Sequence, residues 1–265
     1  MIRVGVLGAT GRMGSQVCRA VADDPEVTLV AAISPSRVGE QIGPLIGHSE
    51  LDVRISDELE TVLQADADVL VDFTRPDVVM ENVRWAIEHA VHLVVGTTGI
   101  GPEQLTEIEE LLEEDGCHVI VAANFAVGAV LAQRFAEQAA RHFAAAEVIE
   151  LHHEGKLDAP SGTALATARR IAAARAGERD APDKENVPGV RGGDVEGVRV
   201  HSVRLPGLVA HQEVLFGGPG ETLSIRHDSL DRTSFMPGVL EAIKQIAARP
   251  GLTVGIEPLL GLDDS

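Results

Sequence analysis

The chain has 265 residues, of which 45% are hydrophobic and 24% charged, and its formal net charge is −19 at pH 7. This composition is typical of a soluble globular protein with one large domain or two smaller ones. The strong negative charge argues against non-specific binding to nucleic acid or anionic membranes, and no apolar run approaches the roughly 20 residues needed to cross a bilayer.

The first half of the chain alternates short β-branched runs with helical ones. Strands are predicted at 2–9, 27–34, 53–56, 67–74, 92–99 and 118–125, and helices at 11–22, 57–64, 76–89 and 102–114. Repeated βα units with near-continuous apolar strands predict a parallel sheet covered on both faces. With short connections and right-handed crossovers, they indicate an α/β fold with a Rossmann-like, doubly wound sheet.

The rhythm changes after Phe125. A helix at 127–142, a strand at 147–153 and a helix at 163–176 precede a polar, Gly/Pro-rich stretch at 177–197, which we interpret as a surface loop. Three strands follow without helices between them, at 198–205, 211–217 and 221–229, and predict a second α+β domain with an open mixed sheet. A helix at 234–248 and a strand at 252–258 are expected to return to the first domain. The predicted domains are therefore 1–123 with 233–265, and 124–232.

The N-terminus and the cysteines bear on location. The segment MIRVGVLGATG lacks the long apolar core and cleavage site of a signal peptide. The two cysteines, Cys18 and Cys117, suggest neither a disulfide framework nor a zinc site. We therefore expect a cytoplasmic protein with no membrane or nucleic-acid partner.

The segment GATGRMG, residues 8–14, follows the first predicted strand and opens the first helix. Its glycines permit a tight turn and let the backbone approach a pyrophosphate. The helix N-terminus then presents free N–H groups to the anion. This setting predicts a dinucleotide site, and a plain tight βα turn is the alternative.

Cofactor choice is expected to depend on the end of the second strand, where an Asp or Glu would hold the ribose 2′-OH of NAD. Ser34 occupies that place, with Ser36 and Arg37 just beyond it. Hydroxyls and a guanidinium in place of a carboxylate suit a 2′-phosphate, so we predict that NADPH is preferred and NADH is possible. The alternative is that Arg37 points into solvent.

Three more loops follow later strands: DFTRP at 72–76, GTTG at 96–99 and AANFAVG at 122–128. Ligands of open α/β sheets bind at the carboxyl ends of the strands. Small residues in these loops allow close approach to the nicotinamide half of a cofactor, although each loop taken alone resembles an ordinary βα turn.

The segment ELHHEGKLDAPSGTA, residues 150–164, gathers the groups that suit proton transfer. His152 and His153 end a strand, so their side chains are expected on opposite faces. This argues against a shared metal ion, and no metal is predicted. Gly155 breaks the strand and brings Lys156 within reach of one histidine. A histidine and a lysine together can donate protons near neutral pH; surface histidines and a chance lysine are the alternative.

Ser161 is a good N-cap for the helix predicted from Thr163. The Ser-Gly-Thr motif can be read as a cap only. The helix N-terminus with its hydroxyls also makes a carboxylate site, which a positive Lys156 would reinforce. We infer a small carboxylate substrate that meets a reduced nicotinamide.

Taken in order, GATGRMG, VDFTRP, GTTG, AANFAVG and ELHHEGKLDAPSGTA resemble the 4-hydroxy-tetrahydrodipicolinate reductase (dihydrodipicolinate reductase) family over nearly the whole chain. The later RHDSLDRTSFMPG is also similar. The resemblance implies NAD(P)H-dependent reduction of 4-hydroxy-tetrahydrodipicolinate, a small dicarboxylate, to tetrahydrodipicolinate with loss of water, in lysine and diaminopimelate biosynthesis. It also implies a homotetramer built through the sheet of the second domain.

The resemblance assigns roles to individual residues. His152 would be the catalytic proton donor and acceptor, and Lys156 a proton donor. The substrate carboxylates would be bound by His153, Gly162 and Thr163, with Ser161 alongside. With Arg75 nearby, the cofactor would be lined by Gly8, Ala9, Thr10, Gly11, Arg12, Met13, Gly96, Thr97, Thr98, Ala122, Ala123, Asn124 and Phe125.

Two segments depart from the family pattern. Ser34 stands where the family often has an acidic residue, which bears on dual use of NADH and NADPH. The segment RLPGLVAHQEV, residues 204–214, lacks the usual glycines after its arginine. We expect it to alter a turn beside the site without touching the catalytic positions.

Other enzyme classes fit the sequence less well. Short-chain dehydrogenases need a tyrosine, and the chain has none. A semialdehyde dehydrogenase needs a cysteine nucleophile on a cofactor-facing loop, where neither cysteine is expected. A non-catalytic NADPH-binding regulator would not need the His-His-x-x-Lys cluster. An amino-acid dehydrogenase, such as aspartate dehydrogenase, is the best enzymatic alternative.

Overall fold

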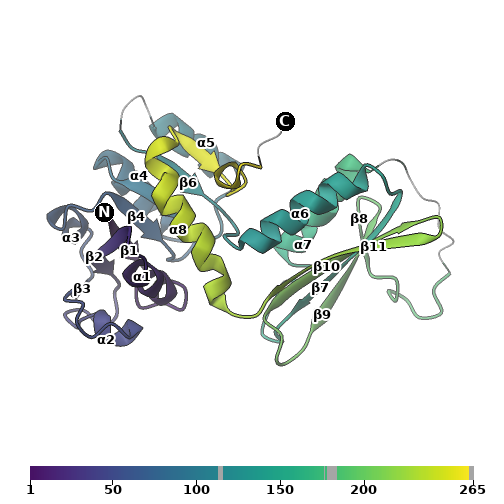
Figure 1. Cartoon of the computed structure of the whole chain (residues 1–265), viewed down its shortest axis with the longest axis horizontal. Coiled ribbons are helices and arrows are strands. Elements are labelled where there is room, and N and C mark those ends of the chain that lie inside the picture. Colours follow the sequence, from purple (N-terminus) through teal and green to yellow (C-terminus); the bar gives the residue numbers. More distant parts are fainter. Residues whose placement is uncertain (113–115, 176, 178–183, 263–265) are drawn as a thin grey trace. The chain divides into compact units, whose positions relative to one another are not determined.

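The computed structural model describes residues 1–112, 116–175, 177 and 184–262. The chain forms two compact units, one of Met1–Phe125 with Phe235–Ser265 and one of Ala126–Ser234. Each unit is built on a single sheet (Figure 1). The C-terminal segment returns to the first sheet as its edge strand, as the sequence predicts.

The first unit contains a seven-stranded sheet in which every neighbouring pair is parallel. The strand order is β12-β6-β5-β4-β1-β2-β3. The order reverses between β1 and β4, and ligands of doubly wound sheets bind at such a switch point. The strands are β1 (Ile2–Leu7), β2 (Val27–Ile33), β3 (Ile55–Ser56), β4 (Val69–Asp72), β5 (His92–Val95), β6 (Val119–Val121) and β12 (Leu252–Val254).

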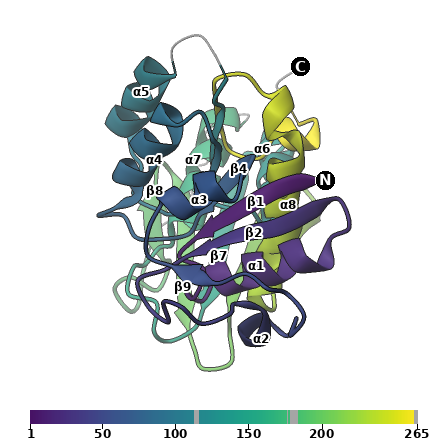
Figure 2. The ribbon, with the colours of Figure 1, turned by 90° about the vertical axis from the view of Figure 1, so that its left-hand side faces the viewer.

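Helices cover both faces of this sheet, with α3, α4 and α5 on one face and α1 and α8 on the other (Figure 2). On the first face, Val62, Val83 and Ile108 from the helices pack in one core with Leu70 and Leu93 from the strands. The helices are α1 (Gly14–Asp23), α2 (Gly43–Ile46), α3 (Glu60–Gln64), α4 (Val79–Glu88), α5 (Pro102–Leu111) and α8 (Met236–Gln245). Short 3-10 helices are η1 (Arg232–Phe235), η2 (Ile246–Ala248) and η3 (Pro258–Leu260).

The second unit contains a mixed five-stranded sheet with the order β11-β10-β7-β9-β8. Only β7 and β9 run parallel, and the other pairs are antiparallel. The strands are β7 (Ala145–His152), β8 (Gly193–Val195), β9 (Val198–Arg204), β10 (Ala210–Gly218) and β11 (Glu221–Ser229). The α/β fold class with a second mixed-sheet domain is therefore confirmed.

Two helices, α6 (Val127–Ala140) and α7 (Gly162–Ala174), pack against each other and against this second sheet (Figure 1). Alanines such as Ala136 and Ala168 face Val148, Val200 and Val214 of the strands in one buried core. Small side chains on the helices let them approach the sheet closely, so the β-branched strand residues fill the space between.

Some predicted boundaries are wrong. Helix α1 begins at Gly14 and not at residue 11, because the glycine loop first makes a turn that the Gly11 N–H closes on the Gly8 carbonyl at 2.8 Å. Helix α4 begins three residues after Pro76, which opens a turn. The last strand ends at Val254, and the predicted loop at 177–197 includes strand β8.

Several predictions reach residues outside the described part of the chain. Residues 178–183 of the predicted loop lie there, as do the predicted helix ends at 114 and 176. Helix α2, a single turn, was missed because four residues carry no helical periodicity.

Candidate functional site

The glycine-rich loop lies between β1 and α1, at the carboxyl end of the parallel sheet. Gly8 has a φ of 74°, and a Cβ there would lie 2.5 Å from the carbonyl oxygen of Phe73. A Cβ at Gly14 would lie 2.0 Å from the carbonyl oxygen of Gly8. Only glycine fits these two positions. Gly11 and Arg12 are exposed, and no side chain of the described residues caps the start of α1. The N–H groups at this helix start therefore suit an anion.

Asp72 organises the neighbouring loops, although the sequence analysis did not single it out. Its buried carboxylate accepts hydrogen bonds from the Thr74 hydroxyl at 2.8 Å and the Thr97 hydroxyl at 2.6 Å. Its other oxygen accepts one from the Asn82 amide at 2.7 Å. Asp72 thus joins the ends of β4 and β5 to helix α4. Thr97, predicted to line a cofactor, uses its hydroxyl in this scaffold.

Aromatic packing connects the three predicted loops at 72–76, 96–99 and 122–128. The rings of Phe73 and Phe125 lie 6.0 Å apart, and a Cβ at Gly96 would lie 2.2 Å from the Phe73 ring. Ala122 donates its N–H to the carbonyl of Val95 at 3.0 Å. The tertiary structure thus brings the GTTG and AANF segments together at the same sheet edge as the glycine loop.

The remaining cofactor candidates differ in exposure. Ala9, Ala122 and Phe125 are buried, whereas Thr98 and Ala123 are exposed. Met13 and Asn124 are half-buried. Arg75 is exposed and forms an ion pair with Asp77 at 2.9 Å. The exposed members are the ones that a ligand at this edge can reach without rearrangement.

At the end of β2 a cluster of hydroxyls joins two loops. Thr10 forms hydrogen bonds with Ser34 at 2.5 Å and with Ser36 at 2.7 Å. Ser34 is only 3% exposed, so Ser36 presents the cluster to the surface. Arg37 is exposed and pairs with Glu40 at 3.2 Å. The structure therefore brings Thr10 and Ser34 together, and it gives Arg37 a partner that the sequence analysis did not foresee.

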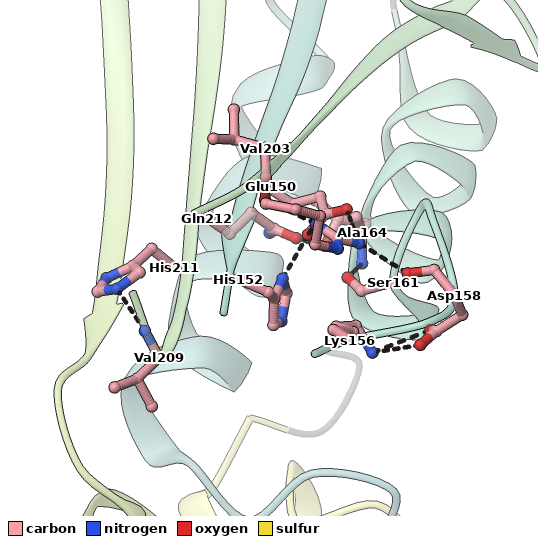
Figure 3. Close-up of polar contacts among 12 residues, drawn as sticks. Glu150, His152, Lys156, Asp158, Ser161, Ala164, Val203, Val209, His211 and Gln212 are labelled. Carbon is pink, nitrogen blue, oxygen red and sulfur yellow. Dashed lines mark hydrogen bonds and ion pairs between the residues drawn. The ribbon is translucent and has the colours of Figure 1, made fainter. Parts of the chain in front are cut away.

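In the second unit, one face of the sheet changes from apolar to polar along its strands. On β7, Val148 is followed on the same face by Glu150 and then His152. The register places Ser202 and Gln212 beside Glu150, and Arg204 beside His152. We call these five residues, Glu150, His152, Ser202, Arg204 and Gln212, the polar end of the sheet. The polar end lies beside the N-terminus of α7, where Ser161 is located (Figure 3).

Glu150 is the centre of this polar end. It is completely buried, and its carboxylate accepts a bond from His152 Nδ1. Arg204 grips the same carboxylate with two donors, at 3.0 and 2.8 Å. Burial opposes ionisation of Glu150, but the hydrogen bonds from Arg204, Ser202 and His152 outweigh it and hold the pKa of Glu150 below its ordinary 4.5.

The protonation state of His152 follows from the same contacts. Burial lowers the pKa of His152 below its ordinary 6.5, Glu150 partly offsets that effect, and the charges of Lys156 and Arg204 add to it. At neutral pH the ring is therefore neutral and donates Nδ1–H to Glu150. Nε2 has no hydrogen-bond partner among the described residues. Such a nitrogen can take or give a proton.

Lys156 lies in the loop after β7. Its ammonium group donates to both carboxylate oxygens of Asp158, at 2.7 and 2.9 Å (Figure 3). It is close enough to His152 to lower the pKa of that ring, as the loop geometry predicts. The sequence analysis missed Asp158 as the partner of Lys156, although a spacing of two residues across a tight loop makes such a pair feasible.

The residues predicted to bind substrate differ in exposure and in hydrogen bonding. Ser161 Oγ accepts the N–H of Ala164 at 3.2 Å, which confirms the predicted N-cap of α7. Gly162 is exposed at the helix start, and Thr163 is half-buried. His153 is exposed, lies past the end of β7 near Gly155, and makes no side-chain hydrogen bond within the described part of the chain.

The expectation that residues 204–214 touch none of the catalytic positions is wrong. Arg204 binds the carboxylate that holds His152, and Leu205 donates its N–H to the His152 carbonyl at 3.1 Å. Ala210 pairs with His152 from the other side. Strands β9 and β10 flank β7 at this point, and a separation of about fifty residues hides that contact from the sequence.

Within the described ranges, no group of three or more His, Cys, Asp or Glu side chains is arranged to hold a metal ion. Across the same residues, no helix is both long enough and apolar enough to span a membrane.

Comparison with known families accounts for this combination of features. The N-terminal region of dihydrodipicolinate reductase matches residues 2–125, and its C-terminal region matches residues 128–260. The chain belongs to the dihydrodipicolinate reductase family. The resemblance expected from the sequence motifs is thereby confirmed.

Individual family members are similar over their full length. The chain is 52% identical to the 4-hydroxy-tetrahydrodipicolinate reductase of Nocardia farcinica, over 98% of this chain and 99% of the relative. It is 50% identical to that of Mycolicibacterium vanbaalenii, over 98% and 100%. A dihydrodipicolinate reductase from Paenisporosarcina sp. TG-14, solved with bound dipicolinate, is 41% identical with a TM-score of 0.85, over 97% and 99% of the two chains.

Proposed function

We propose that this chain reduces 4-hydroxy-tetrahydrodipicolinate to tetrahydrodipicolinate, with loss of water, in lysine and diaminopimelate biosynthesis. The observation that carries the proposal is the polar end of the second sheet, next to Lys156 and the start of α7. There Glu150 holds a neutral His152 whose Nε2 meets no partner among the residues that the structure describes. The full-length similarity to reductases of this name supports it. Membership in the family favours this function over the amino-acid dehydrogenase alternative.

The first unit fits a nicotinamide dinucleotide, which supplies a hydride when bound. Gly8 and Gly14 let the loop fold tightly on itself and against Phe73, where any Cβ would clash with backbone atoms. We assign the pyrophosphate to the loop from Gly8 to Met13 and the nicotinamide half to the loops at 96–98 and 122–125, with Arg75 nearby. Asp72 holds the loops after β4 and β5 together, and we assign it no contact with the cofactor.

We propose that NADPH is preferred and that NADH is also used. No carboxylate follows β2 at the place of Ser34, and Ser36 and Arg37 are exposed just beyond it. Ser34 is buried against Thr10, so its role is to orient Ser36. Glu40, paired with Arg37, works against a bound phosphate and reduces the preference.

Protons in this reaction are assigned to the second unit. Departure of a hydroxyl as water needs a proton, which the Lys156 ammonium group carries, while Nε2 of the neutral His152 ring can take up a proton and return it. The two substrate carboxylates are assigned to the start of α7, through Gly162 and Thr163, and to His153, with Ser161 fixing the helix start.

The same proposal covers assembly and location. We assign residues 1–123 with 233–265 to dinucleotide binding and 124–232 to substrate binding and oligomerisation. A homotetramer formed through the five-stranded sheet fits a sheet whose described helices pack on one face. A cytoplasmic location fits the two buried free cysteines, in which burial raises the thiol pKa to about 12 at Cys18 and about 11 at Cys117.

A coupled assay tests the function. Dihydrodipicolinate synthase supplies the substrate, and oxidation of NADPH and of NADH is followed separately. We expect turnover with both cofactors and a higher kcat/KM with NADPH. Turnover should be lost in His152→Ala. Absence of turnover with either cofactor contradicts the proposal. Oxidative deamination of aspartate with NAD or NADP, measured on the same preparation, would instead support the amino-acid dehydrogenase alternative.

A further inference from the structure

Arg204 joins two parts of the polar end that lie on different segments. Its Nη1 and Nη2 grip Glu150. Nη2 also donates to the carbonyl of Asp158 at 2.7 Å, the residue whose carboxylate holds Lys156. One guanidinium therefore fixes both the strand that carries His152 and the loop that carries Lys156.

The bond from Glu150 decides which nitrogen of His152 is available. A carboxylate can only accept, so Nδ1 must carry the hydrogen, and Nε2 is left with its lone pair in the neutral ring. This works only while Glu150 is ionised. A completely buried carboxylate would otherwise take up a proton, and the two-pronged pairing with Arg204 opposes that.

We propose that Glu150 and Arg204 are positioning residues of the reductase site, which fix the tautomer of His152 and tie the Lys156 loop to the sheet. The proposal rests on the proposed function, in which His152 and Lys156 handle protons. Neither positioning residue needs to touch the substrate. Their sequence separation of 54 residues is bridged by the parallel pairing of β7 and β9.

The charged groups around His152 predict opposite effects for the two residues. Glu150 on β7 favours the imidazolium, whereas Arg204 on β9 and Lys156 in the loop disfavour it. The neighbour of His152 on β10 is Ala210, which carries no charge. Removing the charge of Glu150 should therefore lower the pKa of His152. Removing that of Arg204 should raise it as long as the protonated His152 ring keeps Glu150 ionised.

The test uses the full chain with three changes, Glu150→Gln, Arg204→Met and the double variant. Glu150→Gln leaves the half-buried guanidinium of Arg204 without its counter-charge and risks unfolding, whereas the double variant removes both charges together. The pKa and tautomer of His152 are measured by NMR of ¹⁵N-histidine in the substrate-free protein. The coupled assay then gives kcat and KM.

We expect Glu150→Gln to lower the pKa of His152. It should also reduce kcat by about 100-fold and leave KM within about threefold of the parent value. Arg204→Met should raise that pKa. The double variant should fold and keep the loss of kcat. Glu147→Gln is the matched control, because Glu147 also lies on β7 and pairs with an arginine and a histidine, Arg191 and His201. It should leave the pKa of His152 and kcat unchanged.

Two results would overturn the proposal: an unchanged titration of His152 in each folded single variant, or a kcat within about twofold of the parent in the double variant. The NMR measurement needs no substrate. A parent protein with no reductase activity would therefore contradict the proposed function, while the NMR result would still decide whether Glu150 and Arg204 control His152.

Discussion

The two candidate binding regions rely on different parts of the chain. At the edge of the parallel sheet, the backbone does most of the work, through Gly8, Gly14 and the start of α1, while the arginines there remain exposed. At the polar end of the mixed sheet, buried side chains do the work, with Glu150 completely enclosed between His152 and Arg204.

This difference has a physical basis. Free N–H groups and a helix dipole attract a phosphate without titrating, so a dinucleotide is held alike at any physiological pH. Proton transfer needs a group whose pKa is set by its surroundings, and burial next to opposite charge is the means by which proteins set it. The groups proposed to transfer protons, His152 and Lys156, therefore lie together at the polar end, beside the buried carboxylate of Glu150.

The largest effect that separates the two regions is expected from His152→Ala. Loss of the proton-transferring ring should reduce kcat by about 10³-fold and leave cofactor affinity unchanged, because the first unit is untouched. The coupled assay and a fluorescence titration with NADPH measure the two quantities. A kcat close to that of the parent would remove His152 from the proposed mechanism.

The backbone region is tested by Gly8→Ala. The φ of 74° and the contact of 2.5 Å with the Phe73 carbonyl should cost about 2 kcal/mol of unfolding free energy and weaken NADPH binding. Gly39→Ala is the control, since Gly39 has a φ of 84° but open space around a Cβ. Urea unfolding should show a smaller loss there, and an equal loss in both variants would mean that the backbone angle alone matters.

Cofactor choice is expected to respond more weakly, because the groups involved are exposed. Arg37→Ala should raise KM for NADPH by about tenfold and leave KM for NADH unchanged. Glu40→Gln should act in the opposite direction by removing a negative charge beside the phosphate. Steady-state kinetics with both cofactors would contradict the assignment if the two variants changed NADH and NADPH alike.

The smallest effect is a dependence of stability on pH that comes from the polar end. Both His152 and Glu150 have folded pKa values below their ordinary 6.5 and 4.5. As the pH falls, such groups take up protons in the unfolded chain before they do so in the folded chain. Their contribution to stability is therefore complete above the ordinary pKa and is lost as the pH falls through the pKa of the folded state.

Urea unfolding between about pH 7.5 and pH 4 measures this loss. His152→Gln should reduce the loss of unfolding free energy that begins below pH 6.5, and Glu147→Gln should leave that loss unchanged. An unchanged slope in His152→Gln would show that His152 titrates alike in the folded and unfolded chains.

The sequence by itself was sufficient for much of the fold and for the local motifs. The alternation of helical runs with near-continuous apolar strands predicted the parallel sheet, and ELHHEGKLDAPSGTA marked His152, Lys156 and the capped start of α7. These features depend on neighbours within a few residues. Element boundaries were less accurate, because turns such as that after Pro76 compete with helix formation.

Only the tertiary structure decided which distant side chains meet. It joined Asp72 to the loop after β5, buried Ser34 against Thr10, and brought Arg204 to Glu150. No local pattern encodes these contacts, because they follow from strand order and register. The charge state of His152 follows from burial and from these partners, and a sequence specifies neither until it has folded.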